Sequence, residues 1–236
     1  MESKHCVRVL RLKKGATIAL VDGKGRLCMA EITVANPKRC VVAIKATQSE
    51  YKKRDYYLHI AIAPTKNIAR FEWFLEKATE IGIDEITPLL CHRSERRTIK
   101  PERLNKILIA AMKQSLKAYL PRLNPMQKLV NFVQATSSNG YHEENKAQRF
   151  IAFCEEEHIN SPLIKGARGI LKSKYKKGSD VIILIGPEGD FTREEIKKAL
   201  ENDFQPVRLG ESRLRTETAG IVACHTIHTI EILNVK

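Results

Sequence analysis

Residues 181–195, VIILIGPEGDFTREE, contain a predicted strand, a tight loop and the start of a helix. The apolar run 181–185 is rich in Ile and Val, which is typical of a strand buried on both faces. Thr192 lies three residues before Glu195, the spacing of a capping box, so a helix is predicted over 193–200. A buried strand followed directly by a helix indicates an α/β protein, in which ligands bind beyond the carboxyl ends of the strands.

The same alternation continues on both sides of this stretch. Strands are predicted over 57–63, 85–91, 150–154 and 206–209, and helices over 68–81, 101–119, 163–173 and 217–233. Asn67 is the predicted N-cap of the first of these helices, and Gly82 its predicted end. Residues 137–148 are expected to form a surface loop. Over residues 56–236 we therefore expect a mostly parallel sheet that is covered by helices on both faces.

Residues 1–50 follow a different pattern. Three short β-type runs, 16–21, 27–34 and 40–46, are separated by the turn signals DGKG at 22–25 and NP at 36–37. This spacing predicts a small barrel or a curled sheet. The polar stretch 48–55 interrupts the pattern, and we place a domain boundary there.

The composition predicts an anionic partner. The 236 residues include 41 Lys and Arg against 27 Asp and Glu, a net charge of +14. Residues 1–55 contain 13 of these cations and 5 of the acids, so this segment alone carries +8. A clustered excess favours RNA, because cations that neutralise phosphates release condensed counterions. A basic surface that serves solubility is the alternative.

Several other classes are disfavoured. No apolar stretch approaches the roughly 20 residues that span a bilayer, and the first residues do not resemble a secretory signal, so we expect no membrane segment and a cytoplasmic protein. His225 and His228 share a helix face but lack further zinc ligands, so no metal is expected. The cysteines show no metal-type spacing and are expected to be buried, reduced thiols: Cys6, Cys28, Cys40, Cys91, Cys154 and Cys224.

Two loops contain the candidate functional residues. In GPEGD at 186–190 the glycines leave bare backbone for a ligand, while the two acids would repel a phosphate, so a positive centre or a neutral adenosine fits better. The alternative is that GPEG forms a purely structural turn. In LGESRLRTETAG at 209–220, Arg213 and Arg215 share one face of an extended segment. A structural interpretation of the second loop makes Thr216 an N-cap and Glu217 a first-turn acid.

Together these loops resemble the ribosomal RNA small subunit methyltransferase E family of the SPOUT superfamily. HxxRVLRL from His5, KATEIG at 77–82 and QS at 114–115 match as well. The resemblance implies an α/β fold, with a SPOUT-type trefoil-knotted, mostly parallel sheet at 56–236 and a PUA-like RNA-binding β domain at 1–50. Family members usually carry more residues before HxxRVLRL, so the first strand of the β domain could be absent here. The commoner family loop has a glycine where this chain has Asp190.

The resemblance also implies S-adenosylmethionine as cofactor, a homodimer, and methylation of a uridine base nitrogen, N3, in 16S rRNA of the small ribosomal subunit. In this reaction charge spreads onto the uracil oxygens, so we expect Arg215 to be catalytic as the cation that faces them. Glu217 is expected to act as a base or as a group that orients Arg215. The expected cofactor-binding residues are Cys154, Gly186, Pro187, Glu188, Gly189, Leu209, Gly210, Ser212, Leu214 and Thr218. The expected RNA-binding residues are Arg8, Arg11, Lys14, Arg93, Arg96, Gln114 and Lys117.

Two other functions remain open from the sequence. One is a SPOUT methyltransferase that acts on tRNA or on a ribose hydroxyl. The other is a non-catalytic RNA-binding factor in ribosome assembly. Trp73 and Phe74 are interpreted as core or dimer-surface residues rather than as a platform for stacking a base.

Overall fold

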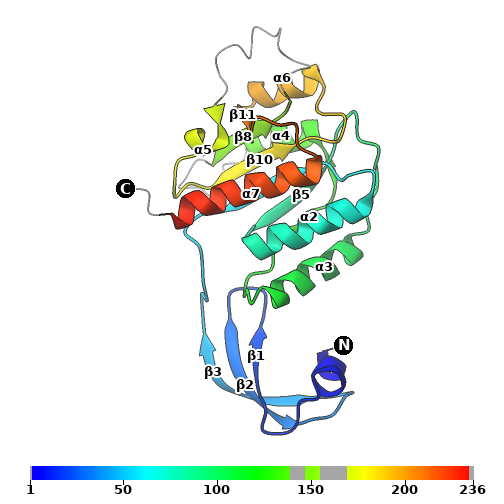
Figure 1. The fold of residues 1–236 in the computed structure, drawn as a ribbon, viewed down its shortest axis with the longest axis vertical. Coiled ribbons are helices and arrows are strands. Elements are labelled where there is room, and N and C mark those ends of the chain that lie inside the picture. Colours follow the sequence, from blue (N-terminus) through cyan, green and yellow to red (C-terminus); the bar gives the residue numbers. More distant parts are fainter. Residues whose placement is uncertain (1, 139–146, 155–168, 234–236) are drawn as a thin grey trace. The chain divides into compact units, whose positions relative to one another are not determined.

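The computed structural model describes residues 2–138, 147–154 and 169–233 and divides into two compact units (Figure 1). The first comprises Met1–Lys53 and Met112–Leu120, and the second Arg54–Ala111 and Pro121–Lys236. Among the described residues, no helix has the length and apolar character needed to cross a membrane.

The first unit is built on a three-stranded antiparallel sheet in the order β1-β2-β3. Its strands are β1 (Thr17–Val21), β2 (Leu27–Val34) and β3 (Val41–Gln48), which confirms the three predicted runs, and α1 (Glu2–Lys4) and η1 (His5–Val9) precede them. The DGKG turn forms as predicted, because the Asp22 carboxylate accepts hydrogen bonds from the backbone N–H of Lys24 at 2.7 Å and of Arg26 at 3.0 Å.

A distant segment joins this unit. The Gly25 N–H donates to the Ala118 carbonyl at 2.9 Å, and the Leu120 N–H donates to the Gly23 carbonyl at 2.9 Å. A Cβ at Gly25 would lie 2.3 Å from the Tyr119 ring, so only glycine allows this approach. Residues 112–120 therefore complete the first unit, an assignment that the sequence did not indicate.

The second unit contains a sheet in which all neighbouring strands are parallel, in the order β6-β5-β4-β10-β8-β11-β9, with β7 beside β5. The α/β class and the parallel sheet are thus confirmed. The strands are β4 (Leu58–Ile62), β5 (Glu85–Leu90), β6 (Arg122–Leu123), β7 (Gln127–Lys128), β8 (Gln148–Ala152), β9 (Gly169–Ile170), β10 (Val181–Ile185) and β11 (Gln205–Arg208).

Helices cover both faces of this sheet. On one face α2 (Ile68–Ile81) and α7 (Thr216–Ile232) pack side by side (Figure 1), and Ile62 of β4 lies with Phe74 near Gly220. Ala61 and Ala63, which alternate with Ile62, belong to the core beneath α4 (Leu129–Ser138) and α6 (Arg193–Glu201). The remaining helices are α3 (Pro101–Gln114) and α5 (Leu171–Lys174).

The ends of several elements differ from the prediction. The helix predicted over 101–119 ends at Gln114, and Leu116 has a φ of 53°, which a right-handed helix does not allow. Of the helix predicted over 163–173, residues 163–168 lie outside the described residues, and the helix that is described starts at Leu171. The predicted loop 137–148 overlaps the end of α4 and the start of β8, while 139–146 are not described.

Two further expectations were wrong. Arg215, not Thr216, is the N-cap of α7, and Thr216 is the first helical residue and is buried. All six cysteines are free, as expected, but only Cys28, Cys91 and Cys224 are buried. The others are partly exposed, because they lie in the N-terminal helical segment, beside β3 and at the end of β8: Cys6, Cys40 and Cys154.

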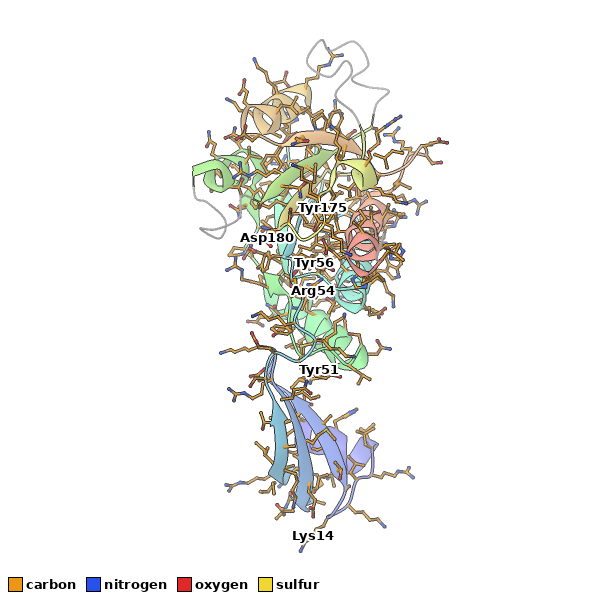
Figure 2. The ribbon with its side chains drawn as sticks, turned by 90° about the vertical axis from the view of Figure 1, so that its left-hand side faces the viewer. Lys14, Tyr51, Arg54, Tyr56, Tyr175 and Asp180 are labelled. Carbon is orange, nitrogen blue, oxygen red and sulfur yellow. The ribbon has the colours of Figure 1, made fainter. Side chains whose placement is uncertain are left out.

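Polar contacts fasten the C-terminal half of α7. The Tyr56 hydroxyl lies 3.1 Å from Nδ1 of His228, and the Tyr175 hydroxyl donates to the Glu231 carboxylate at 2.6 Å. Arg54 donates to the Tyr56 hydroxyl at 3.1 Å and forms an ion pair with Asp84 (Figure 2 labels Arg54, Tyr56 and Tyr175). These contacts fix the helix whose other end carries Arg215.

Candidate functional site

The loop after β10 is attached to the ends of neighbouring strands. The Glu188 carboxylate accepts a hydrogen bond from the Lys66 N–H at 2.8 Å, in the segment that follows β4. The Gly189 carbonyl accepts one from Nη1 of Arg93 at 2.6 Å, in the segment that follows β5. Residues of the GPEG motif therefore hold three strand ends together.

Asp190 joins the same loop to β8. Its Oδ2 accepts from the Cys154 N–H at 2.7 Å, its Oδ1 accepts from the Phe191 N–H at 2.7 Å, and its own N–H donates to the Pro187 carbonyl at 2.9 Å. The residue is buried and has a φ of 61°, a left-handed conformation that Asp tolerates better than most residues. A Cβ at Gly186 would lie 3.2 Å from the Phe191 ring, so packing within the loop accounts for this glycine.

The predicted capping box is confirmed. The Thr192 hydroxyl accepts from the Glu195 N–H at 3.2 Å, and the Glu195 carboxylate accepts from the Thr192 N–H at 2.9 Å. The second Glu195 oxygen accepts from the His92 N–H at 2.8 Å, so the cap also holds the segment after β5. The start of α6 is thereby fixed beside the loop.

These loops enclose a cavity of about 690 Å³ at the carboxyl ends of β8, β10 and β11. This volume lies within the roughly 300–1,000 Å³ of sites for small ligands. Most of the predicted cofactor-binding residues line it: Cys154, Gly186, Pro187, Glu188, Leu209, Gly210, Ser212 and Leu214. Gly189 does not, because it faces Arg93, whose Cβ would be 3.3 Å from a Cβ at this position. Thr218 does not line it either and contributes to a second cavity instead.

The lining combines open main chain, charges of both signs and apolar side chains. Among the described residues, no hydrogen bond involves residues 210–214, so their main-chain groups are available to a ligand. A Cβ at Gly210 would have no atom within 4 Å, which leaves open space against bare backbone. Glu188, Asp190 and Glu211 bring negative charge to this lining, and Arg208, Arg213 and Arg215 bring positive charge. Apolar side chains such as Leu209 complete it.

A second cavity of about 650 Å³ lies between α2 and the start of α7. Ala69, Arg70 and Trp73 of α2 line one side. The other side consists of Arg213, Leu214, Arg215, Glu217 and Thr218. Residues 213–215 line both cavities and therefore form the wall between them.

The two predicted catalytic residues both reach the second cavity. Arg215 is exposed and caps α7, where its carbonyl accepts from the Ala219 N–H at 2.8 Å. Glu217 is only 8% exposed, and its Oε2 has no hydrogen-bond partner among the described residues. The cation beside it is Arg70, whose Nε lies 3.9 Å from Oε1. No described ion pair joins Glu217 to Arg215, so no contact favours the hypothesis that Glu217 orients Arg215.

The residues predicted to bind RNA fall into two groups. Arg8, Arg11, Lys14 and Gln114 are exposed in the first unit, and the side chain of Lys14 points away from its sheet (Figure 2). Lys117, in the same unit, is half-buried.

Arg93 and Arg96 belong to the second unit and have structural partners. The Arg96 guanidinium donates to the Thr65 carbonyl at 3.0 Å and to the Lys66 carbonyl at 2.5 Å, while Arg93 donates to Gly189. Both arginines therefore hold loops beside the first cavity in place.

Within the described ranges, no group of three or more His, Cys, Asp or Glu residues is placed to hold a metal ion. The pair His225 and His228 has other partners. His225 contacts the Thr229 hydroxyl at 3.4 Å, and His228 contacts Tyr56.

The sequence did not single out Arg70, and it interpreted Trp73 together with Phe74. Phe74 is fully buried, as expected for the core, whereas Trp73 is 44% exposed and lines the second cavity. The helical spacing of the apolar residues could have separated the two, because Trp73 falls off the stripe formed by Phe71, Phe74 and Ala78.

Comparisons with known proteins agree with this architecture. Residues 52–228 match the family described as RNA methyltransferase domain, and residues 2–45 match the RNA methyltransferase PUA domain. Ribosomal RNA small subunit methyltransferase E of Synechocystis sp. is 30% identical over 94% of this chain and 69% of the relative. The protein of that name from Bacillus subtilis is 27% identical over 96% of this chain and 86% of the relative.

Two solved structures extend the likeness to the whole fold. A probable rRNA-methyltransferase from Porphyromonas gingivalis is 44% identical, with a TM-score of 0.85 over 98% of this chain and 91% of that chain. A ribosomal RNA small subunit methyltransferase E from Neisseria gonorrhoeae, solved bound to S-adenosyl methionine, is 26% identical, with a TM-score of 0.80 over 98% of this chain and 90% of that chain.

Proposed function

This chain belongs to the ribosomal RNA small subunit methyltransferase E family, and we propose that it transfers a methyl group from S-adenosylmethionine to N3 of a uridine in 16S rRNA. The observation that carries the proposal is the first cavity. The two motif loops that follow β10 and β11 meet there, and their open main chain, apolar side chains and acidic groups suit this cofactor. The relative from Neisseria gonorrhoeae was solved with the same compound.

The cofactor supplies an activated methyl group on a sulfonium centre when it is bound. The chain's contribution is to hold and orient it. We assign the hydrophobic contacts to Leu209, Leu214 and Pro187, and the polar contacts to the main chain of residues 210–214. Glu188 and Asp190 provide negative charge near the positive centre. Because both carboxylates are hydrogen-bonded to backbone N–H groups, they are held in place before a ligand enters.

We assign proton transfer to Glu217 and electrostatic stabilisation to Arg215. N3 of uracil lies between two carbonyl groups, and its lone pair becomes available as its proton leaves and charge spreads onto the oxygens. Glu217 accepts this proton through Oε2, the oxygen without a partner. Arg215, at the wall between the two cavities, stabilises the charge on the uracil oxygens.

The first unit docks the RNA, and two copies of the chain form a homodimer. Exposed Arg8, Arg11 and Lys14 give the PUA-like unit phosphate contacts, and a single-stranded loop or junction presents the base edge that these enzymes need. For the dimer we propose the C-terminal end of α7, where Ile232 is 62% exposed and Leu233 48% exposed. Ile227, earlier on the same helix, is already buried within its own unit.

Single-turnover methylation of 30S subunits at saturating cofactor tests the function, with nucleoside mass spectrometry of the product. The expected product is a uridine methylated at N3, and Arg215→Ala should lower the rate by roughly 10²- to 10³-fold, the range for losing one preorganised donor. Arg215→Lys should restore only part of the rate, because a point charge lacks the guanidinium fork.

Lys197→Gln is the matched control, because Lys197 is an exposed cation on α6 that lines neither cavity. A methylated ribose or a methylated tRNA would contradict the proposed substrate. Cofactor binding without methylation of any RNA would favour the non-catalytic alternative. A near wild-type rate in Arg215→Ala would refute the role of Arg215.

A further inference from the structure

The second cavity is lined by a large aromatic side chain, Trp73, that is not part of the hydrophobic core. Buried residues of α2 form one face of the helix, whereas Trp73 lies off that face and is 44% exposed. Trp73 lines the cavity together with Arg70, one turn earlier on the same helix. An exposed indole beside cations is a combination that binds unstacked nucleobases, because every base has a π-face and a polar edge.

The opposite side of this cavity offers groups for a polar edge. Arg213 and Arg215 supply only donors, while Glu217 supplies an acceptor. The Glu217 side chain is 10% exposed, and its Oε2 has no hydrogen-bond partner among the described residues. A buried carboxylate oxygen without a hydrogen-bond partner is unfavourable unless a ligand donates a hydrogen bond to it. The arrangement therefore calls for a ligand that donates a hydrogen bond to Glu217.

We propose that the second cavity is the binding site for the target uracil, with Trp73 as the stacking surface, Glu217 as the acceptor for N3–H, and Arg70 and Arg215 as donors to the carbonyl oxygens. Uracil presents a carbonyl, an N–H and a second carbonyl in a row. Donors on either side of an acceptor complement this edge. Cytosine presents an acceptor at N3, which would face the carboxylate of Glu217 and be rejected.

The position of this cavity agrees with the assignment. Residues 213–215 line both cavities, so the two cavities adjoin along this segment and a base in the second lies beside a cofactor in the first. The inference rests on the proposed function and specifies its substrate site. It adds Trp73 and Arg70, neither of which was predicted to bind RNA.

Intrinsic fluorescence provides a direct test, because Trp73 is the only tryptophan in the chain. We would titrate the full-length protein with single-stranded hexauridylate and, separately, with hexacytidylate. Stacking should quench the emission saturably with hexauridylate and much less with hexacytidylate. RNA bound only to the first unit would not distinguish the two oligonucleotides at Trp73.

Variants define the roles. By anisotropy of labelled hexauridylate, Trp73→Leu should weaken binding about 5- to 140-fold, which corresponds to the 1–3 kcal/mol of one stacked base. Trp73→Phe should keep most of the affinity. Glu217→Gln and Arg70→Gln should reduce the preference for hexauridylate over hexacytidylate, whereas Lys197→Gln should not. In methylation of 30S subunits, Trp73→Leu should raise KM more than it lowers kcat.

Cofactor affinity by calorimetry shows whether each variant is folded, because the first cavity does not include Trp73 or Arg70. Equal quenching by both oligonucleotides, or quenching by neither, would overturn the inference. So would emission that changes on dilution of the protein without RNA, since a second copy would then cover the cavity. If the wild type methylates 30S subunits and Trp73→Leu does so with unchanged kcat/KM, the inference fails and the proposed function stands. If quenching is specific for uridine but the protein methylates no RNA, the uracil site stands and the proposed function fails.

Discussion

Replacing Asp190 with alanine should loosen the loop after β10 and weaken cofactor binding. The Asp190 carboxylate accepts hydrogen bonds from the N–H groups of Cys154 and Phe191, both at 2.7 Å, and is buried. It therefore joins the end of β8 to the GPEG loop, and both segments line the first cavity. Alanine would remove both hydrogen bonds, including the one from the Cys154 N–H that links β8 to the loop.

The magnitude follows from three contributions. Hydrogen bonds to a charged group contribute about 1.5–3 kcal/mol each, and the φ of 61° costs alanine roughly 1–2 kcal/mol relative to a residue that tolerates it. Water can replace part of the loss, because Cys154 is only half-buried. We therefore expect Asp190→Ala to lower the free energy of unfolding by about 3 kcal/mol and to raise the Kd for S-adenosylmethionine by roughly 10- to 100-fold.

Two further substitutions at this position separate the contributions. Asp190→Gly accepts the positive φ but loses both hydrogen bonds, so it should be about 1 kcal/mol more stable than Asp190→Ala. Asp190→Asn keeps an acceptor and tolerates the conformation, so it should be the least affected. Asp203→Ala is the matched control, because Asp203 has a φ of 64° but its side chain is 77% exposed.

Chemical denaturation would measure stability, and titration calorimetry would measure cofactor affinity. Asp203→Ala should show the conformational loss and the loss of its 3.8 Å ion pair with Arg149, but no change in Kd. An Asp190→Ala variant with both the stability and the Kd of the wild type would refute the reasoning, because the two hydrogen bonds would then contribute nothing to the site.

Three other predictions concern stability and RNA binding. Burial lowers the pKa of His59 to about 4, from 6.5 in the unfolded chain, so the unfolded state binds more protons between these values. The free energy of unfolding should therefore fall by about 3 kcal/mol as the pH drops from 6.5 to 4, and His59→Gln should flatten this slope in acid denaturation. A Cβ at Gly220 would lie 2.6 Å from the Phe74 ring, so Gly220→Val should lower the melting temperature and the free energy of unfolding by about 2–3 kcal/mol, whereas Gly210→Val, with no neighbouring atom within 4 Å, should not. Affinity for rRNA fragments should fall steeply with salt in filter-binding assays, and when Gln replaces all three of Arg8, Arg11 and Lys14 the slope should become shallower, by about one unit for each phosphate that is no longer neutralised.

The parts of the fold that the sequence predicted are those with local causes. The strand over 181–185 and the helix after Thr192 were predicted because β-branched residues and a capping box act over a few positions, and the structure confirms both. Asn67 caps α2 as predicted, and Gly82 ends it with a φ of 133°. In each case the residues that determine the structure are neighbours in the chain.

Features with distant causes were missed. The helix α4 has no strong cap signal, and Phe132 and Val133 become core residues only through α6 and the sheet. Residues 112–120 continue an apolar helical pattern, yet hydrogen bonds to Gly23 and Gly25 draw them into the first unit. These hydrogen bonds join positions about 90 residues apart in the sequence. The periodicity of apolar residues describes only neighbouring positions, so it could not predict them.

The candidate site shows the same division. The resemblance to the methyltransferase family implied that the GPEG and LGESRLRT segments contribute to one cofactor site, and most of their residues line one cavity. Spacing could not show that Gly189 turns toward Arg93 instead, because that orientation depends on a hydrogen bond from another strand end. It also could not reveal the second cavity, which forms where α2 packs against α7.

The way α7 is held would allow an exposed side chain such as Arg215 to act with precision in the proposed reaction. Its carbonyl is fixed as the helix cap by the Ala219 N–H, and the far end of α7 is fastened through His228 and Glu231. Between these ends, Gly220 allows α7 to approach Phe74 of α2 closely. The start of α7 therefore cannot shift relative to α2 without disturbing the core, so the wall at 213–215 keeps its position between the two cavities. Because a misplacement of about 1 Å can lower a rate by about 100-fold, substitutions along this distant helix surface should slow methyl transfer even when both ligands still bind.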